Sequence, residues 1–523
     1  MHLHRLFVLS AAPVDLLLYS YHFLCNTKRY SIVLIVLYPL RPFEHQEGKE
    51  LEAFTKFLVK IDDYVWGLPL IIAILAVGLL LTIRLRGLQF RRMGLGFKFL
   101  FSKESSGKTK DSGDVTSFQA LCTALSATIG TGNIVGVATA IAAGGPGALF
   151  WMWMAALVGT ATKYAECMLA VKFRTKAADG HIVGGPFYYI ENGMGEKWKW
   201  LAKIFAFFGL LVGLFGIGTF TQINGITSAV QNFFDPETKT AVHMFGHAYS
   251  VSTVIAGLLL TVCVAMVIIG GLRRISLVAE KIVPFMAVVY IAISLIVILT
   301  HLTEVPAAFA EIVQSAFGLR AAAGGALGAM VMAMQKGIAR GIFSNEAGLG
   351  SAPIAAAAAK TNEPVRQGLI SMLGTVIDTL IICTMTGLTI VIMGAWKIDG
   401  LEGVQITTKA FQMGLPFQER VSSFLLMMCL VFFAFTTILG WDYYSERCLD
   451  YLTHNSNKAV WIFRYLYILC VFIGPYMTVK AVWTIADIVN GLMAIPNLIA
   501  LTALSSVAVA ETKKYFDSHR QLS

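Results

Sequence analysis

One apolar stretch, long enough to cross a bilayer, is interrupted in its middle by residues that disfavour a helix. Residues 118–159 read FQALCTALSATIGTGNIVGVATAIAAGGPGALFWMWMAALVG, and Gly130, Thr131, Gly132 and Asn133 fall inside the first apolar run. Glycine lowers helix stability by about 1 kcal/mol relative to alanine, so this run favours a broken helix. Within lipid, a break is tolerated only where protein, water or a ligand satisfies the freed backbone groups. A packing kink is the alternative interpretation.

The composition places the chain in a membrane. Of its 523 residues, 56% are hydrophobic and 14% are charged, whereas soluble proteins carry roughly 25% charged residues. Apolar runs of about 20 residues recur, which predicts an all-α polytopic membrane protein. The net charge of +10 is expected in cytoplasmic loops and does not indicate nucleic-acid binding. Eight scattered cysteines without a C-x-x-C pair predict neither a disulfide framework nor a zinc site.

Basic residues predict how the chain crosses the membrane. The predicted spans, about eleven, cover residues 66–83, 118–143, 147–171, 200–230, 251–270, 282–299, 322–359, 369–396, 421–441, 461–479 and 483–508. Arginine and lysine cluster after the first and third spans, which places both loops in the cytoplasm by the positive-inside rule. The same alternation places the C-terminal tail, residues 511–523, in the cytoplasm. Residues 1–50 form an N-terminal extension to which we assign no role.

A second span also contains helix-breaking residues. Residues 322–359 are too long for one plain crossing. They include GIARGIFSNEAGLG at residues 337–350, which predicts a second break between Gly341 and Gly348.

The two broken spans each open a group of five crossings, and the two groups enter the membrane from opposite sides. The first group lies in residues 118–300 and the second in residues 301–510, while residues 51–117 add one helix and a basic loop. Opposed groups that each begin with a broken helix are typical of inverted-repeat transporters, whose site lies at the midplane between the breaks. The sequence therefore predicts a secondary transporter.

A signature around the first break carries a family resemblance. Residues 144–153 read GGPGALFWMW, with Gly159 closing the run, and the run resembles the signature of the alanine or glycine:cation symporter family (sodium:alanine symporters). GTGNIVG before this run and GIFSNEAGLGSAP after it are similar to the same family, and the resemblance extends from about residue 60 to the tail. It implies a LeuT-like fold of five plus five helices with an extra N-terminal helix. It also implies sodium-driven uptake of alanine, glycine or similar amino acids across a bacterial-type inner membrane.

The residues expected at the substrate site lie beside a break or carry a polar group at midplane depth. A helix that restarts after a break presents unpaired N–H groups with partial positive charge, which suit a substrate carboxylate. Aromatic rings can wall or cap the pocket, and a midplane glutamine must find a hydrogen bond. Close helix packing, an interfacial anchor and bonds to a neighbouring helix are the alternatives. The expected substrate residues are Thr131, Gly132, Asn133, Gln222, Gly341, Phe343, Ser344 and Trp441.

The similarity to LeuT-like transporters also implies a sodium site. Thr436 and Thr437 in FFAFTTILGW would supply hydroxyl oxygens, and Phe433 one turn earlier would supply a carbonyl. Ser126 and Ile129, before the first break, would supply two further carbonyls. The alternative is that the threonines bond back to their own helix, as is frequent in membranes.

Ionisable residues inside the spans are functional candidates because charge at membrane depth is costly. Lys336 and Arg340 share a helix face and repel each other unless partners intervene. Glu166 and Asp378 from other spans are candidate partners, and a structural or gating ion pair and a direct contact with the substrate are the two alternatives. If the coupling ion is a proton, Glu166, Asp378 or Glu346 would carry it.

The sequence contains no nucleophile–base pair, metal-ligand pair or nucleotide loop at a plausible depth. We therefore expect a protein that is not an enzyme and needs no cofactor. Its expected partners are a small neutral amino acid, a sodium ion as the coupling ion, and the lipid bilayer. A proton-coupled amino-acid symporter is the alternative, and the sequence carries no signal for the oligomeric state.

Overall fold

The computed structural model describes residues 56–62, 64–102, 112–177, 180–244, 247–319, 325–477 and 479–519. The predicted N-terminal extension, residues 1–50, lies outside these residues. The chain divides into two units, one of residues 1–55 with 243–248 and one of residues 56–242 with 249–523. The second unit contains the site.

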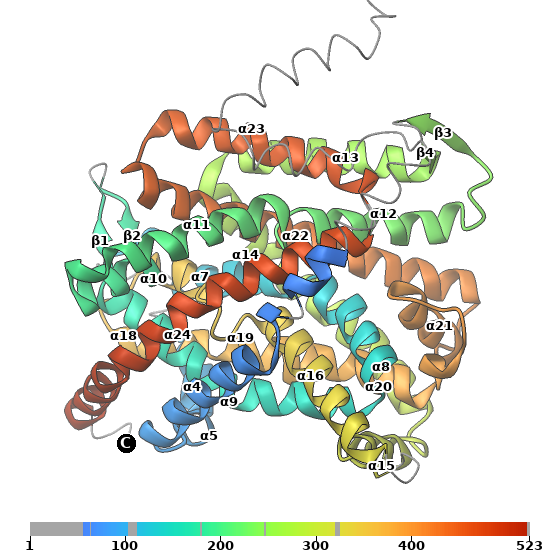
Figure 1. Cartoon of the computed structure of the whole chain (residues 1–523), viewed down its shortest axis with the longest axis horizontal. Helices are drawn as coiled ribbons and strands as arrows, with labels where there is room; N and C mark the ends of the chain where they lie inside the picture. Colours follow the sequence, from blue (N-terminus) through green and yellow to red (C-terminus); the bar gives the residue numbers. More distant parts are fainter. Residues whose placement is uncertain are drawn as a thin grey trace, which may run out of the picture. The chain divides into compact units, whose positions relative to one another are not determined.

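The second unit is built from α-helices (Figure 1). Its first half contains α4 (Leu68–Arg84), α5 (Leu88–Arg91), α6 (Met93–Leu100), α7 (Ser117–Thr128), η4 (Gly132–Gly136), α8 (Val137–Gly144), α9 (Gly147–Lys172), α10 (Pro186–Tyr188), η5 (Tyr189–Gly193), η6 (Glu196–Trp198), α11 (Lys199–Phe215), α12 (Phe220–Phe234), α13 (Val251–Ile268) and α14 (Gly271–Thr300). Its second half contains α15 (Val305–Ala316), α16 (Ala326–Asn345), α17 (Ala352–Ala357), α18 (Pro364–Ser371), α19 (Leu373–Thr375), η7 (Val376–Cys383), α20 (Thr384–Ile392), η8 (Ala395–Lys397), α21 (Val404–Gly414), α22 (Glu419–Thr453), α23 (Asn457–Ile473), η9 (Gly474–Tyr476) and α24 (Val479–Ser518).

Short strands accompany the helices. They are β1 (Thr175–Lys176), β2 (Ile182–Val183), β3 (Ala241–Met244) and β4 (His247–Ser250). β1 pairs antiparallel with β2, and Thr175 stands opposite Val183.

Within the described residues, seven helical segments are long and apolar enough to cross a membrane. They are Glu196–Phe234, Val251–Ile268, Gly271–Thr300, Pro364–Ile392, Glu419–Thr453, Asn457–Tyr476 and Trp483–Ser518. A bent pair, Ser117–Thr128 with Gly132–Gly144, makes an eighth candidate. The prediction of an all-α polytopic membrane protein is confirmed, whereas the number of eleven spans stays a prediction.

The first predicted break is present. α7 begins in a capping box. The Thr116 hydroxyl accepts from the backbone N–H of Gln119, and the Gln119 side-chain oxygen accepts from the backbone N–H of Thr116. Such a box satisfies two of the donors left free at a helix start. The helix ends at Ile129, whose ψ of 93° is extended, and the chain restarts at Gly132 with a bend of 51° between the halves.

The second break lies later than predicted. α16 stays helical through Gly341 to Asn345, and the chain then turns at Glu346, whose φ is +56°. Gly348 and Gly350 follow with φ of +90° and +83°, a backbone region that glycine adopts at little cost. The unwound segment is therefore 346–351. The prediction that it begins at Gly341 is wrong because that glycine has a packing role.

The packing role of Gly341 is visible at α9. A Cβ on Gly341 would lie 3.3 Å from the Cα of Met152. The missing side chain thus lets α16 approach α9 closely, as small residues do between membrane helices. A glycine in a membrane helix can serve either packing or unwinding, and the sequence alone did not separate the two.

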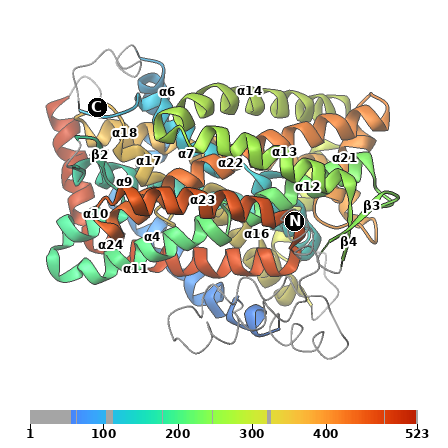
Figure 2. The same ribbon diagram turned by 90° about the horizontal axis from the view of Figure 1, so that it is seen from above.

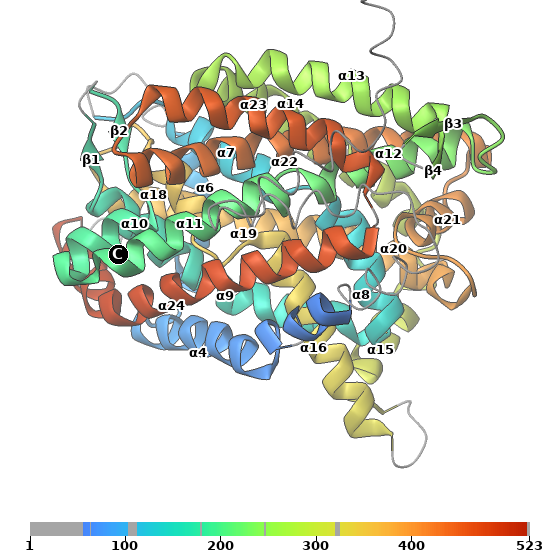
Figure 3. The same ribbon diagram turned by 45° about the horizontal axis from the view of Figure 1, so that its top comes forward.

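Two long helices flank the broken ones. α9 packs against α16, α17 and α18, and α22 packs against α7, α11, α12 and α14. α12 lies beside α13 (Figure 2), and α13 runs along α23 (Figure 3). The polar groups of the breaks consequently face protein rather than lipid.

Candidate functional site

The two breaks meet at one buried carboxylate, that of Asp378 in η7. Asn133, at the restart of the first broken helix, donates from Nδ2 to Asp378 Oδ1 at 2.7 Å. Ser344, at the end of α16, donates from Oγ to Asp378 Oδ2 at 2.9 Å. Thr379 donates to the same oxygen at 2.7 Å, and Asp378 is fully buried. Residues from both breaks therefore share one polar centre.

The restart of the first broken helix also touches the last turn of α16, just before the second break. A Cβ on Gly132 would lie 3.4 Å from Phe343 Cδ1 and 3.4 Å from the Cα of Ser344. The Oδ1 atom of Asn133 accepts from the Gly130 N–H at 2.9 Å, which satisfies one of the donors that the first break frees.

Gln222 of α12 reaches the first break. Its Oε1 accepts from the backbone N–H of Thr131 at 3.0 Å. A Cβ on Gly130 would lie 2.9 Å from that oxygen and 2.5 Å from Thr437 Oγ1, so only glycine leaves room for both side chains. The Thr131 hydroxyl is buried and has no hydrogen-bond partner among the described residues. A buried polar group of this kind is costly without a ligand or water.

Four of the five residues expected to bind sodium are linked to one another where the end of α7 meets α22. The single O–H of Thr437 is shared between the carbonyl of Ile129 at 3.2 Å and that of Phe433 at 3.1 Å. Thr436 Oγ1 donates to the same Phe433 carbonyl at 2.9 Å. Both threonines thus bond back to their own helix, and Thr437 also bridges to the first break. The cluster offers several uncharged oxygens within hydrogen-bond distance of one another.

Ser126 completes the contact between these two helices. Its hydroxyl donates to the Thr123 carbonyl at 2.8 Å. A Cβ on Gly440 would lie 2.8 Å from Ser126 Oγ, so α22 approaches α7 through a glycine one turn beyond Thr436.

The remaining expected substrate residues divide into two groups. Trp441 is buried, and its Nε1 donates to Glu346 Oε1 at 2.8 Å at the second break. Phe343 stacks on Trp483, with ring centroids 5.2 Å apart. Gly341 instead faces Met152 of α9.

Arg340 pairs with a residue that the sequence analysis did not consider. Its guanidinium makes a bidentate ion pair with Asp487 of α24, at 3.1 and 2.9 Å, and stacks over Phe343 and Trp483. The Asp487 carbonyl accepts from Trp66 Nε1 at 2.7 Å. The expectation that Glu166 or Asp378 pairs with Arg340 is wrong, because the guanidinium reaches the carboxylate of Asp487 instead.

Glu166 belongs to a different buried group. Its Oε2 accepts from Asn497 Nδ2 at 3.0 Å, and Asn497 also donates to the carbonyl of Gly348 in the unwound segment at 2.9 Å. Lys163 Nζ lies 3.9 Å from Glu166 Oε1, and both side chains are buried. Asn497 and Lys163 were missed, although a polar residue inside an apolar span is a usable signal.

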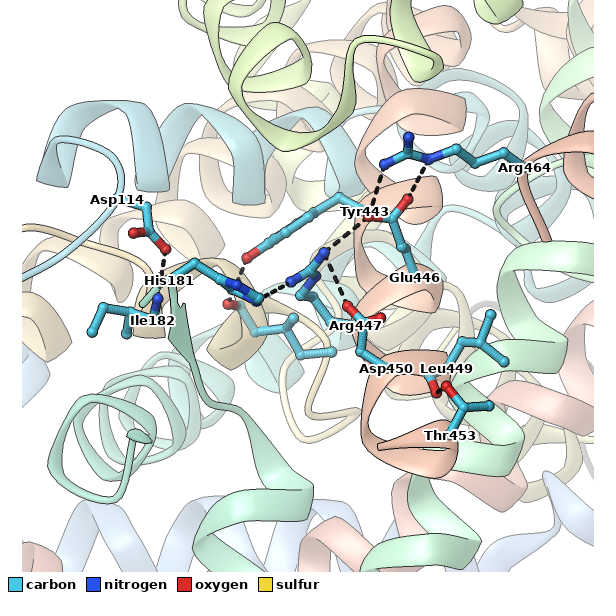
Figure 4. A network of polar contacts seen from close by, with 11 residues as sticks. Asp114, His181, Ile182, Tyr443, Glu446, Arg447, Leu449, Asp450, Thr453 and Arg464 are labelled. Atoms are coloured by element: carbon cyan, nitrogen blue, oxygen red, sulfur yellow. Dashed lines mark hydrogen bonds and ion pairs between the residues drawn. The ribbon is translucent and has the colours of Figure 1, made fainter. Parts of the chain in front are cut away.

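A charged network fixes the far end of α22 (Figure 4). Arg447 contacts Glu446 at 2.9 Å, Asp450 at 3.0 Å and the His181 ring at 2.7 Å. Arg464 of α23 pairs with Glu446 at 2.7 Å. The network anchors the helix that carries Thr436, Thr437 and Trp441.

Residues 51–523 match the model of the sodium:alanine symporter family. Over 467 residues, the chain is 43% identical to "Sodium/alanine symporter AgcS" of Methanococcus maripaludis, and the alignment covers 88% of this chain and 97% of that protein. It is 38% identical to "Probable sodium/glutamine symporter GlnT" of Bacillus subtilis, covering 87% and 89%. In fold it resembles the crystal structure of MhsT in complex with L-phenylalanine, with a TM-score of 0.51, 15% identity, and 77% and 93% of the two chains covered. The predicted LeuT-like fold is confirmed, and the chain belongs to the sodium:alanine symporter family of membrane transporters.

Proposed function

We propose that this protein is a sodium-coupled symporter that imports alanine, glycine or a similar small neutral amino acid by alternating access. The observation that carries the proposal is the meeting of two broken helices at buried polar groups, with the Thr437 hydroxyl bonded across to Ile129. Freed peptide groups at midplane depth are the means by which such folds bind a zwitterion and its ion. The names of the relatives support sodium as the coupling ion. They differ in the amino acid, which is alanine in one name and glutamine in another.

The substrate carboxylate is proposed to bind at the restart of the first broken helix. The N–H groups there carry partial positive charge, and the unpartnered Thr131 hydroxyl lies beside them. Gln222 Oε1 accepts from the Thr131 N–H. If that bond opened, the Thr131 N–H and the Gln222 Nε2 would both be able to donate to the carboxylate. Carbonyls at the end of α16, near Ser344, are proposed to accept from the ammonium group. The rings of Phe343 and Trp441 would bound the pocket and favour a small side chain.

The sodium ion is proposed to bind between α7 and α22. The hydroxyls of Thr436 and Thr437 and the carbonyl of Phe433 would provide three oxygens, and the carbonyls of Ser126 and Ile129 would provide two more. In the structure, the two hydroxyls donate to carbonyls, and on ion binding they would rotate to present their lone pairs. Sodium would thereby tie the first break to α22, and reciprocal coupling requires that it tighten amino-acid binding.

The proposed topology follows the positive-inside rule. The basic loops after α4 and α9, and the C-terminal tail, would lie in the cytoplasm of a bacterial-type cell. Residues 118–300 and 301–510 would form the two inverted repeats, and residues 51–117 would add the extra helix.

A binding titration tests the substrate and the ion together. Purified protein would be titrated with glycine, L-alanine, D-alanine and glutamine, in sodium buffer and in matched choline buffer. We expect glycine or alanine to bind in sodium and to bind at least about ten-fold more weakly in choline, which is within the usual range of coupling. Equal affinities in both buffers would contradict sodium coupling.

Proton coupling is the second candidate, and one observation favours it. Among the described residues, Glu166, Glu346 and Asp378 are fully buried, whereas Lys163 is the one buried lysine or arginine, and it lies 3.9 Å from Glu166. A buried carboxylate that has no basic partner can bind and release a proton, and such residues form proton relays in transporters. Uptake driven by a pH gradient in sodium-free buffer would favour this candidate, and its absence would exclude it.

A further inference from the structure

Glu346 holds an unusual position at the start of the unwound segment. It is a non-glycine residue with a φ of +56°, a conformation that tends to persist only where surrounding contacts enforce it. Two side chains supply such contacts, because Trp441 Nε1 donates to Oε1 at 2.8 Å and Ser351 Oγ donates to Oε2. All three side chains are at most 1% exposed. The carboxylate therefore bridges both ends of the second break to α22.

Trp441 occupies a specific place on α22 relative to the proposed ion site. It follows Thr437 by four residues, so the two side chains lie on one face of the helix in adjacent turns. Thr437 bonds the Ile129 carbonyl at the first break, and Trp441 bonds Glu346 at the second. One helix face thus contacts both breaks within a single turn.

The charge of Glu346 is not needed for this contact. An indole N–H can donate to a neutral amide oxygen too, and that bond is weaker than one to a carboxylate oxygen. The hydroxyl of Ser351 can accept from an amide NH2 as readily as it donates to a carboxylate. A glutamine at this position would preserve both bonds, whereas an alanine would remove both.

We infer that Glu346 is a positioning residue that holds Trp441 against the second break and so couples the sodium site on α22 to the amino-acid site. The inference rests on the proposed function. When sodium binds at Thr437, α22 is fixed relative to the first break, and the Trp441–Glu346 bond transmits that constraint to the second. Without the bond, each ligand would still find its own groups but would no longer strengthen the other.

The coupling ratio tests this inference. It is the dissociation constant of alanine in choline buffer divided by that in sodium buffer, measured on purified full-length protein. We expect Glu346→Ala and Trp441→Phe each to bring the ratio to within about two-fold of one, and Glu346→Gln to keep most of the wild-type ratio. The double variant, Glu346→Ala with Trp441→Phe, should be no worse than either single one, because both remove the same bond.

A matched control is present on the same helix. Tyr451 of α22 donates from its hydroxyl to Glu191, so Tyr451→Phe removes another aromatic-to-glutamate bond outside the site and should keep the wild-type ratio. A wild-type ratio in Trp441→Phe, or a Glu346→Gln ratio as low as that of Glu346→Ala, would overturn the inference. If Glu346→Ala does not fold, Trp441→Phe and Glu346→Gln decide alone, and a Glu346→Gln ratio near one would then overturn the inference. A ratio of one in the wild type would instead reject the proposed sodium coupling itself.

Discussion

Thr437 of α22 donates a hydrogen bond to the carbonyl of Ile129, the residue at which the first broken helix ends, at 3.2 Å. The bond joins two segments that lie 308 residues apart in the chain. It brings together a hydroxyl and the carbonyl at the end of a broken helix, and both are among the oxygens proposed to hold the sodium ion.

Removal of the Thr437 hydroxyl should weaken sodium binding. Thr437→Val keeps the shape of the side chain and deletes one oxygen, and a bond to a charged partner is worth roughly 1.5 to 3 kcal/mol. The sodium concentration that gives half-maximal uptake should therefore rise about ten-fold or more. The matched control is Thr453→Val, because Thr453 lies on the same helix and bonds back to the Leu449 carbonyl at 2.8 Å, outside the proposed ion site. An unchanged sodium dependence in Thr437→Val would argue against the site.

Gly130 should tolerate no side chain. A Cβ there would lie 2.5 Å from Thr437 Oγ1 and 2.9 Å from Gln222 Oε1, so Gly130→Ala displaces groups proposed for the ion and the substrate. Overpacking costs about 1 to 3 kcal/mol, and we expect uptake to fall at least ten-fold while the protein still folds. Gly136→Ala is the control, since a Cβ at that position meets nothing within 4 Å. Equal uptake by the two variants would contradict this role of Gly130.

The pair of Arg340 with Asp487 should show strong non-additivity. Each single change, Arg340→Ala or Asp487→Ala, leaves one charge in a partly buried position, which destabilises the fold more than removing both. We expect thermal unfolding to give an interaction of about 1 to 3 kcal/mol between the two changes. The surface pair of Lys239 with Glu237, both more than 70% exposed, should give an interaction close to zero. Additive changes at Arg340 and Asp487 would show that the pair contributes little.

Glu191, which lies between the membrane spans, should make stability depend on pH. Burial opposes its ionisation, but hydrogen bonds from Lys199 and Tyr451 outweigh this effect and lower the pKa of Glu191 below its usual value. A lowered folded-state pKa contributes stability above the unfolded pKa and loses it as the pH falls through the folded pKa. The wild type should therefore exceed Glu191→Gln in melting temperature at pH 7, and the difference should shrink as the pH falls below about 4. A difference that is constant with pH would exclude this contribution.

The part of the fold that was predictable depended on local signals. Gly130 and Gly132 inside an apolar run indicated the first break directly, because glycine disfavours a helix wherever it stands. The predicted second break lies too early in the chain. Gly341 disfavours a helix as Gly130 does, but in the structure it stays helical and packs against Met152. A glycine can unwind its helix or let another helix pack closely against it. Which of the two occurs depends on the helix that packs there, and the local sequence does not specify that helix.

Long-range partners show the same limit within the candidate site. Lys336 and Arg340 were recognised as residues that need counter-charges, but the choice of Asp487 required the position of α24 relative to α16. Asn497, which bonds both Glu166 and the Gly348 carbonyl, was not singled out, because an asparagine in an apolar span does not identify its partner. The placement of Thr437 beside Ile129 followed from the family resemblance and was not available from spacing alone.

Uptake of radiolabelled alanine into proteoliposomes tests the central proposal most directly. With an inward sodium gradient, we predict that the purified protein accumulates alanine above its external concentration. Accumulation should collapse when a sodium ionophore dissipates the gradient, and it should be greatly reduced in Thr437→Val at limiting sodium. Uptake that is indifferent to both the sodium and the proton gradient would contradict symport.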